Sequence, residues 1–252
     1  MRSRRVVDLP YIALCIGVLL GILIVGMARA GEYEIVDGKG QELCEVCRQN
    51  LVQMTEHPAC ERTYSSTLGL SAPDWKPFDV SEHLGAMKQV MKYLATGNEF
   101  AKDDYVMGEE QYEARLRASV AMGVQWVYRA QVDIDNDGQS DQVLRMPSKE
   151  CNRRNQGYNL AYDTPIVVMK NDLSGLNRTK SDLVEQGLYK KLGQRGDSTY
   201  QMYGVFTYKG KTYFDRWNDT GIQGESQRYT LTVYESRGGE TRKRCQLKEV
   251  DR

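Results

Sequence analysis

The chain has 252 residues, 40% of them hydrophobic, and its 34 basic and 34 acidic side chains give a formal net charge of zero. This length suits one large domain or two small ones. The balanced charge argues against the basic surface that attracts nucleic acid, so we expect no nucleic-acid partner.

The first thirty residues have the three parts of a secretory signal. A basic start with Arg2, Arg4 and Arg5 precedes an apolar run over residues 11–27, and residues 28–30, Ala-Arg-Ala, offer a cleavage site. The competing interpretation is an uncleaved anchor, because the apolar run lies at the short end of the about 17–25 residues that span a bilayer. Either way we expect the rest of the chain outside the cytoplasm, as a periplasmic or secreted protein or one anchored to the membrane through residues 11–27.

The cysteines beyond the leader are candidates for disulfides, since thiols pair in oxidising compartments. They are Cys44, Cys47, Cys60, Cys151 and Cys245. Apolar residues at helical spacing predict a helix over residues 43–54, with Cys44 and Cys47 about one turn apart. We interpret one of these two as a buried thiol and the other as the partner of Cys60, and Cys151 most simply pairs with Cys245.

Two other interpretations of the same cysteines stay open. Cys44, Cys47, His57 and Cys60 offer four soft or borderline ligands within a short segment, which suits a tetrahedral zinc site. Cys44 and Cys47 alone form a Cys-x-x-Cys pair of the kind that performs redox chemistry.

Residues 31–122 are expected to be mainly helical. In residues 81–94 the apolar positions 84, 87, 91 and 94 follow a helical period, with Ser81 placed to cap the start and Gly97 beyond the end. A further helix is predicted over residues 109–117, whose glutamates suit a helix start.

From Gly123 onward the pattern changes to strands. Alternating segments surround Lys209-Gly210 and Gly238-Gly239, which predicts two hairpins, and residues 171–196 are expected to hold a short helix. The sequence therefore predicts an α+β fold, in which a helical region over 31–122 precedes an antiparallel sheet of six or seven strands over 123–252.

The stretch VDIDNDGQSDQVL, residues 132–144, is the sharpest chemical signal in the chain. Its alternating carboxylates and its glycine match the pattern D-x-D-x-D-G-x-x-D, and Ca²⁺ prefers six to eight oxygen ligands on such a curved loop. The pattern resembles the calcium loops of EF-hands, dockerin modules, thrombospondin type 3 repeats and integrin-type repeats. That resemblance implies these ligands: Asp133, Asp135, Asp137 and Asp141 through side chains, and Gln139 through its carbonyl.

One position departs from the EF-hand pattern. The twelfth residue is Leu144, where an EF-hand has a bidentate glutamate, so we expect a loop between strands and a modest affinity for Ca²⁺. The alternative is a plain turn at Asn136-Asp137-Gly138, with the acids solvated on its rim.

The whole chain loosely resembles exported bacterial proteins of unassigned function. The features that carry this resemblance are the leader, Cys44-x-x-Cys47, Cys60-Glu61-Arg62, Ala72-Pro73-Asp74-Trp75, the acidic hairpin and the segment from Gly210 to Asp215. The resemblance implies no activity.

For function, we expect a non-enzymatic exported protein that binds another envelope or secreted protein, as a partner-binding or inhibitor-like module. Neither histidine belongs to a nucleophile motif with a partner serine or cysteine, and the sequence contains no G-x-S-x-G, H-E-x-x-H or glycine-rich phosphate loop. Aromatic residues of the C-terminal hairpins are the candidate binding face: Tyr203, Tyr208, Tyr213 and Trp217. The alternatives are an exported hydrolase that uses a carboxylate pair and a membrane-anchored structural protein of the envelope.

Overall fold

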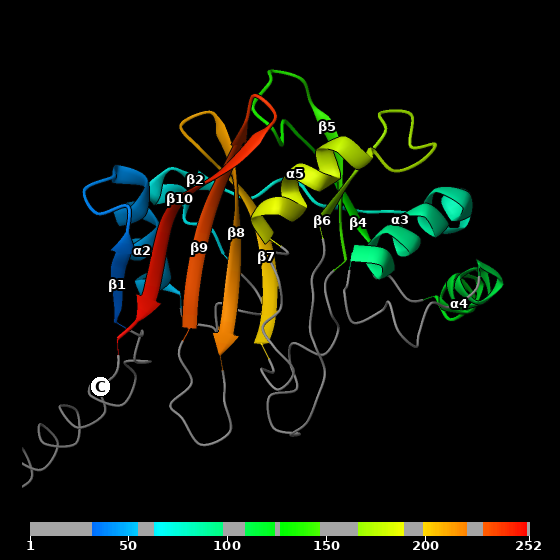
Figure 1. The fold of residues 1–252 in the computed structure, drawn as a ribbon, viewed down its shortest axis with the longest axis horizontal. Helices are drawn as coiled ribbons and strands as arrows, with labels where there is room; N and C mark the ends of the chain where they lie inside the picture. Colours follow the sequence, from blue (N-terminus) through cyan, green and yellow to red (C-terminus); the bar gives the residue numbers. More distant parts are fainter. Residues whose placement is uncertain are drawn as a thin grey trace, which may run out of the picture. The chain divides into compact units, whose positions relative to one another are not determined.

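A computed structural model describes residues 32–54, 63–97, 109–123, 127–146, 166–188, 199–220 and 229–250. All of them belong to one compact unit, residues 31–252. They form ten strands in two antiparallel sheets, together with four α-helices and two short 3-10 turns (Figure 1). The predicted leader, His57, Cys60 and Cys151 lie outside the described residues.

The larger sheet has six strands and contains both predicted hairpins. In spatial order its strands are β1 (Tyr33–Asp37), β10 (Glu240–Glu249), β9 (Tyr229–Arg237), β8 (Lys211–Thr220), β7 (Thr199–Tyr208) and β2 (Leu70–Ser71) (Figure 1). The turns at Lys209-Gly210 and Gly238-Gly239 have positive φ at both residues, which matches the right-handed twist of the strands they join. The predicted hairpins are thereby confirmed.

A second sheet of four strands corrects the expected single sheet of six or seven. Its order is β3 (Lys76–Pro77), β4 (Tyr128–Val132), β5 (Asp141–Arg145) and β6 (Ile166–Met169). The period of apolar residues identifies a strand but not its neighbours, because pairing is decided by contacts far apart in the sequence. The antiparallel character of the fold was nevertheless predicted correctly.

The region expected to be mainly helical also contributes three strands, β1, β2 and β3. Tyr33 and Ile35 of β1 are buried while Glu34 is exposed, and the strand pairs with β10 near the other end of the chain. β2 and β3 are two residues long, too short for any periodic pattern to reveal.

Four α-helices accompany the sheets: α2 (Glu42–Gln53), α3 (Leu84–Gly97), α4 (Glu109–Ala121) and α5 (Arg178–Leu188). Each was predicted, with small differences in length. The start of α3 differs in its cap, because the turn Ser81–His83 precedes it and the Asp79 carboxylate accepts hydrogen bonds from the backbone N–H and hydroxyl of Ser81.

Three groups of buried apolar side chains form the core. One lies between α2 and the large sheet and contains Leu43, Leu51 and Trp217, and a second joins α3 and α4 to the small sheet. The third lies between the two sheets and contains Ile134 of the β4–β5 loop, Val168 of β6 and Phe214 of β8. α5 contacts β6 of the small sheet and β8, β9 and β10 of the large one (Figure 1).

A buried disulfide joins Cys44 of α2 to Cys245 of β10, with 5.5 Å between their Cα atoms. This pairing corrects both expected partners, since Cys245 was assigned to Cys151 and the α2 cysteine to Cys60. Gly38 enables the close approach, because a Cβ at its position would lie 2.6 Å from the sulfur of Cys44 and from the carbonyl oxygen of Arg244. Cys47 is the expected buried thiol, and burial raises its pKa to about 12.

We expect loss of the disulfide to be the costliest change at the α2 end of the fold. The bond closes a loop between residues 201 positions apart, so the double variant Cys44→Ala/Cys245→Ala should unfold with a free energy about 2–5 kcal/mol lower. Urea denaturation measures this. The control is Cys47→Ala, which removes a buried thiol of the same cluster but no crosslink; an equal loss in both variants would contradict the structural role of the bond.

Candidate functional site

The acidic loop connects β4 to β5, and its last acid lies at the start of β5. Asp141 is the first residue of β5 and pairs with Val132, the last residue of β4. Along the loop, Ile134 enters the core between the sheets at 1% exposure, whereas residues 137–140 are exposed. The loop therefore lies on the rim of the small sheet with one apolar residue fixed inside, as expected for a loop between strands.

Hydrogen bonds to its own backbone keep the loop closed. The Asp133 carboxylate accepts from the N–H groups of Asp137 and Gly138, at 2.9 and 2.8 Å, and the Asp137 carboxylate accepts from the N–H of Gln139 at 2.8 Å. Gly138 has φ of 88°, a left-handed conformation that glycine adopts without steric cost. Two of the predicted ligands thus have a structural role within the turn.

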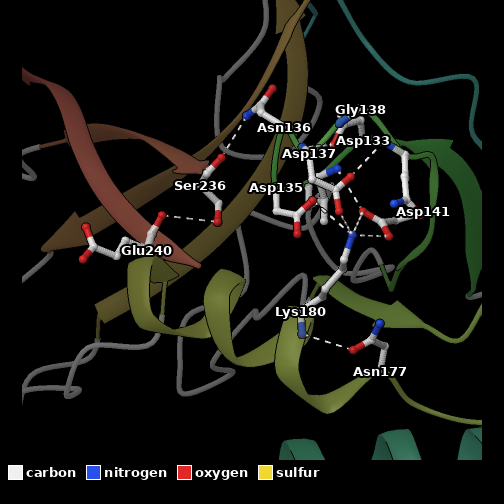
Figure 2. A network of polar contacts seen from close by, with 12 residues as sticks. Asp133, Asp135, Asn136, Asp137, Gly138, Asp141, Asn177, Lys180, Ser236 and Glu240 are labelled. Carbon is white, nitrogen blue, oxygen red and sulfur yellow. Dashed lines mark hydrogen bonds and ion pairs between the residues drawn. The ribbon is translucent and has the colours of Figure 1, made fainter. Parts of the chain in front are cut away.

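Asn136 fastens the loop to the large sheet. Its side-chain NH₂ donates to the carbonyl oxygen of Ser236 on β9 at 3.0 Å (Figure 2). The same NH₂ donates to the carbonyl oxygen of Thr212 on β8 at 3.0 Å, and the amide oxygen accepts from the N–H of Thr212 at 2.8 Å. Its φ of 54° is left-handed, which asparagine tolerates better than most residues. Sequence reasoning treated Asn136 only as part of a turn and missed this connection between the sheets.

A lysine from another element forms ion pairs with three of the acids. The Lys180 ammonium lies 3.0 Å from an oxygen of Asp135, 3.1 Å from one of Asp137 and 2.8 Å from the nearer oxygen of Asp141 (Figure 2). The side chains of Lys180, Asp135 and Asp141 are 18%, 12% and 6% exposed, so the contact is largely shielded from water. Lys180 was not predicted, because nothing in its local sequence links it to residues 133–141.

The first turn of α5 holds Lys180 in place. Asn177 caps the helix by accepting from the backbone N–H of Lys180 at 3.2 Å (Figure 2). The buried hydroxyl of Ser181 accepts from the N–H of Val168 on β6 at 2.9 Å and donates to its carbonyl oxygen at 3.2 Å. Thr241 of β10 donates to the carbonyl oxygen of Leu183 at 2.6 Å. The helix backbone is therefore fixed to both sheets independently of the Lys180 ammonium.

Burial and hydrogen bonding shift the pKa values of Lys180, Asp141 and Asp137. Burial by itself would lower the pKa of Lys180, but hydrogen bonds to Asp141, Asp135 and Asp137 outweigh burial and raise that pKa, so the ammonium stays charged. Burial raises the pKa of Asp141 in spite of its contact with Lys180. The pKa of Asp137 is lowered, first by the N–H of Gln139 and then by Lys180.

The geometry allows a metal ion at part of the predicted site. Carboxylate oxygens of Asp133, Asp135 and Asp141 lie within 4.8 Å of one another, and such a group could hold a cation. These hard oxygen donors fit the preference of Ca²⁺. Asp137 contacts Lys180, and Gln139 is exposed on the rim. Leu144, at the twelfth position of the pattern, is fully buried in the core.

The predicted aromatic binding face is corrected by the structure. Tyr203, Tyr208, Tyr213 and Trp217 are between 0% and 7% exposed. Tyr208, Tyr213 and Trp217 pack in the core against α2, whereas Tyr203 packs between the sheets. Core side chains cover both faces of β7 and β8, so the alternating aromatic residues of these strands fill the core and do not form an exposed binding face.

The structure also argues against the zinc and redox interpretations of the cysteines. Cys44 is bonded to Cys245, which removes it as a thiolate ligand for zinc and as the redox partner of Cys47. His57 and Cys60, the other predicted zinc ligands, lie outside the described residues. The segment is thus part of the disulfide-bonded core in the region the structure describes.

Comparisons with protein-family models, with curated proteins and with solved structures find no match to this chain. Within the described ranges, every helix is too short or too polar to cross a membrane.

We expect Asn136→Ala to destabilise the fold more than any other single change on the loop surface. The substitution leaves the N–H of Thr212 without its acceptor and places alanine at a left-handed φ, which should lower the free energy of unfolding by about 1–3 kcal/mol. Urea denaturation tests this against Gln139→Ala, an exposed position on the same loop. Equal stability of the two variants would show that the contact does not join the sheets.

Proposed function

We propose that this chain is an exported, non-enzymatic protein that binds another protein of its compartment and uses the acidic loop as a structural calcium site. The observation that carries the proposal is the position of the loop, whose Asn136 contacts the large sheet while its carboxylates contact α5. A cation bound where the loop meets the large sheet and α5 would stabilise the whole unit.

The disulfide supports export. Disulfides persist in oxidising compartments and are rare in the cytosol, and the Cys44–Cys245 bond lies in the core with both cysteines at 0% exposure. This agrees with the secretory character of residues 1–30, which stays a prediction.

The contacts of three buried acids, Asp135, Asp141 and Glu235, favour a structural role over a hydrolytic one. A carboxylate-based hydrolase needs one acid able to exchange a proton with substrate and another near the reacting carbon. Asp135 and Asp141 instead contact Lys180, and the buried Glu235 lies within 3.2 Å of Lys211 and 3.1 Å of Arg244. These acids serve as internal ion-pair partners.

The partner surface is proposed at the exposed end of α4. With the hairpin aromatics in the core, the exposed large apolar residues of the described chain include Val120 and Met122, at 36% and 70% exposure. Val36 and Val52 are exposed too, at 44% and 41%, but Met122 is the most exposed of these four residues and follows Val120 by only two positions. We therefore propose the contact at this end of α4, since neighbouring exposed apolar side chains are suited to bind another protein.

We expect Ca²⁺ to raise the thermal midpoint of the protein purified from an oxidising compartment. A ligand that binds only the folded state stabilises it, by about 2.7 kcal/mol when the free ligand is at 100 times its Kd. Melts in millimolar calcium and in chelator measure the shift, which should vanish in Asp135→Asn. The control is Asp172→Asn, an exposed acid of the β6–α5 loop, which should leave the shift unchanged. Coincident melts of the wild type in calcium and chelator would rule out the calcium site.

For the partner, we expect a photo-reactive residue at position 122 to crosslink to one discrete protein in the native compartment. The same residue at the exposed position 139 is the control. Identical products from the two positions, or none from position 122, would remove the end of α4 as the contact surface.

A further inference from the structure

We infer that Lys180 is the resident cation of the acidic loop and that a divalent metal ion binds there only by displacing its ammonium group. Lys180 would then regulate the calcium site, so the inference rests on the proposed function. It goes beyond that function in one respect. The Lys180 ammonium already pairs with the loop carboxylates without metal, so metal binding exchanges one cation for another.

The two cations require the same oxygens. The Lys180 ammonium contacts Asp135 at 3.0 Å and Asp141 at 2.8 Å, and these are two of the three acids whose oxygens lie close enough together to hold a metal (Figure 2). Ca²⁺ binds oxygens at about 2.3–2.6 Å. An ion shared by these carboxylates would therefore occupy the place of the ammonium.

Charge repulsion strengthens the exclusion. The pair Asp135 and Asp141 is largely buried, and charges interact more strongly in such a setting than in water. A divalent ion beside the ammonium would repel it, because both carry positive charge. The single ammonium contacts three of the loop's four carboxylates, so the site retains excess negative charge that a divalent ion compensates more completely.

The exchange requires movement of only one side chain. Asn177, Ser181 and Thr241 fix the backbone of α5 through contacts that do not involve the ammonium. The four-carbon stem of lysine can rotate away while the helix stays in place. Asp137, the most exposed of the three carboxylates that contact Lys180, at 38%, indicates the side on which the ammonium would leave.

The first test compares calcium binding by the wild-type full chain and by Lys180→Met, measured by isothermal titration calorimetry. If Lys180 competes, removing its charge should tighten calcium binding by about 5- to 150-fold, the usual range of coupling between two binding events. The matched control is Lys88→Met, which removes an ammonium of α3 that contacts Glu113 on α4 at 2.8 Å. This control should bind calcium as the wild type does.

The second test needs no variant and so does not depend on the folding of Lys180→Met. Amine-selective labelling of the wild-type chain, followed by peptide mass spectrometry, reports the exposure of Lys180. We expect Lys180 to react slowly in chelator and several times faster in saturating calcium, since burial and ion pairing protect the amine. Labelling of Lys88 should be the same in both conditions.

The outcomes separate the inference from the proposed function. Equal calcium affinities of wild type and Lys180→Met, or unchanged labelling of Lys180 in a calcium-saturated wild type, would overturn the exchange and leave the calcium site standing. No binding to either protein at millimolar calcium would overturn both. Tighter binding by Lys180→Met, with calcium-dependent labelling of Lys180 in the wild type, supports both.

Discussion

The ion pairs of Lys180 with Asp135 and Asp141 are the interaction that lets the acidic loop bury two of its carboxylates against α5. The buried carboxylates of Asp135 and Asp141 would repel one another without a cation beside them. The ammonium from α5 removes this repulsion and joins the loop to a helix that contacts both sheets. Separating such a pair by deleting one charge is costly, because the remaining charge stays desolvated.

Asn136 complements this electrostatic contact with directional ones. Its three hydrogen bonds reach backbone groups of β8 and β9, so one side chain satisfies polar groups on two neighbouring strands. Ile134 enters the core between the sheets two residues earlier. A short segment of the loop thus makes ionic, hydrogen-bonded and apolar contacts in three directions, which explains why so few residues suffice to fix it.

The disulfide plays a comparable role at the other face of the large sheet. It joins α2 to β10, which also pairs with β1, so the beginning and the end of the described chain are held in one core. Cys47 is buried in the same cluster, and burial keeps it as a thiol by raising its pKa to about 12. Its protonation reduces attack on the neighbouring disulfide, because the thiolate is the reactive form.

The sequence by itself determined what depends on neighbours along the chain. The hairpins at Lys209-Gly210 and Gly238-Gly239 were predicted because their turns require residues that accept positive φ. The helices α2 and α3 followed from apolar spacing, and α4 from the glutamates at its start. The acidic loop was also found, because its carboxylates and Gly138 lie within nine residues. These features are set by local backbone preference and by short-range periodicity.

The tertiary structure alone decided the features that join distant residues. They include the division into two sheets, the partner of Cys245, the contacts of Asn136 and the place of Lys180 among the acids. Burial of Tyr203, Tyr208, Tyr213 and Trp217 belongs with them, since a strand covered on one face and a strand covered on both can carry the same alternation of aromatic residues. Each of these is a choice among many possible long-range contacts, and the free energy that settles it comes from packing, desolvation and ion pairing in the assembled fold.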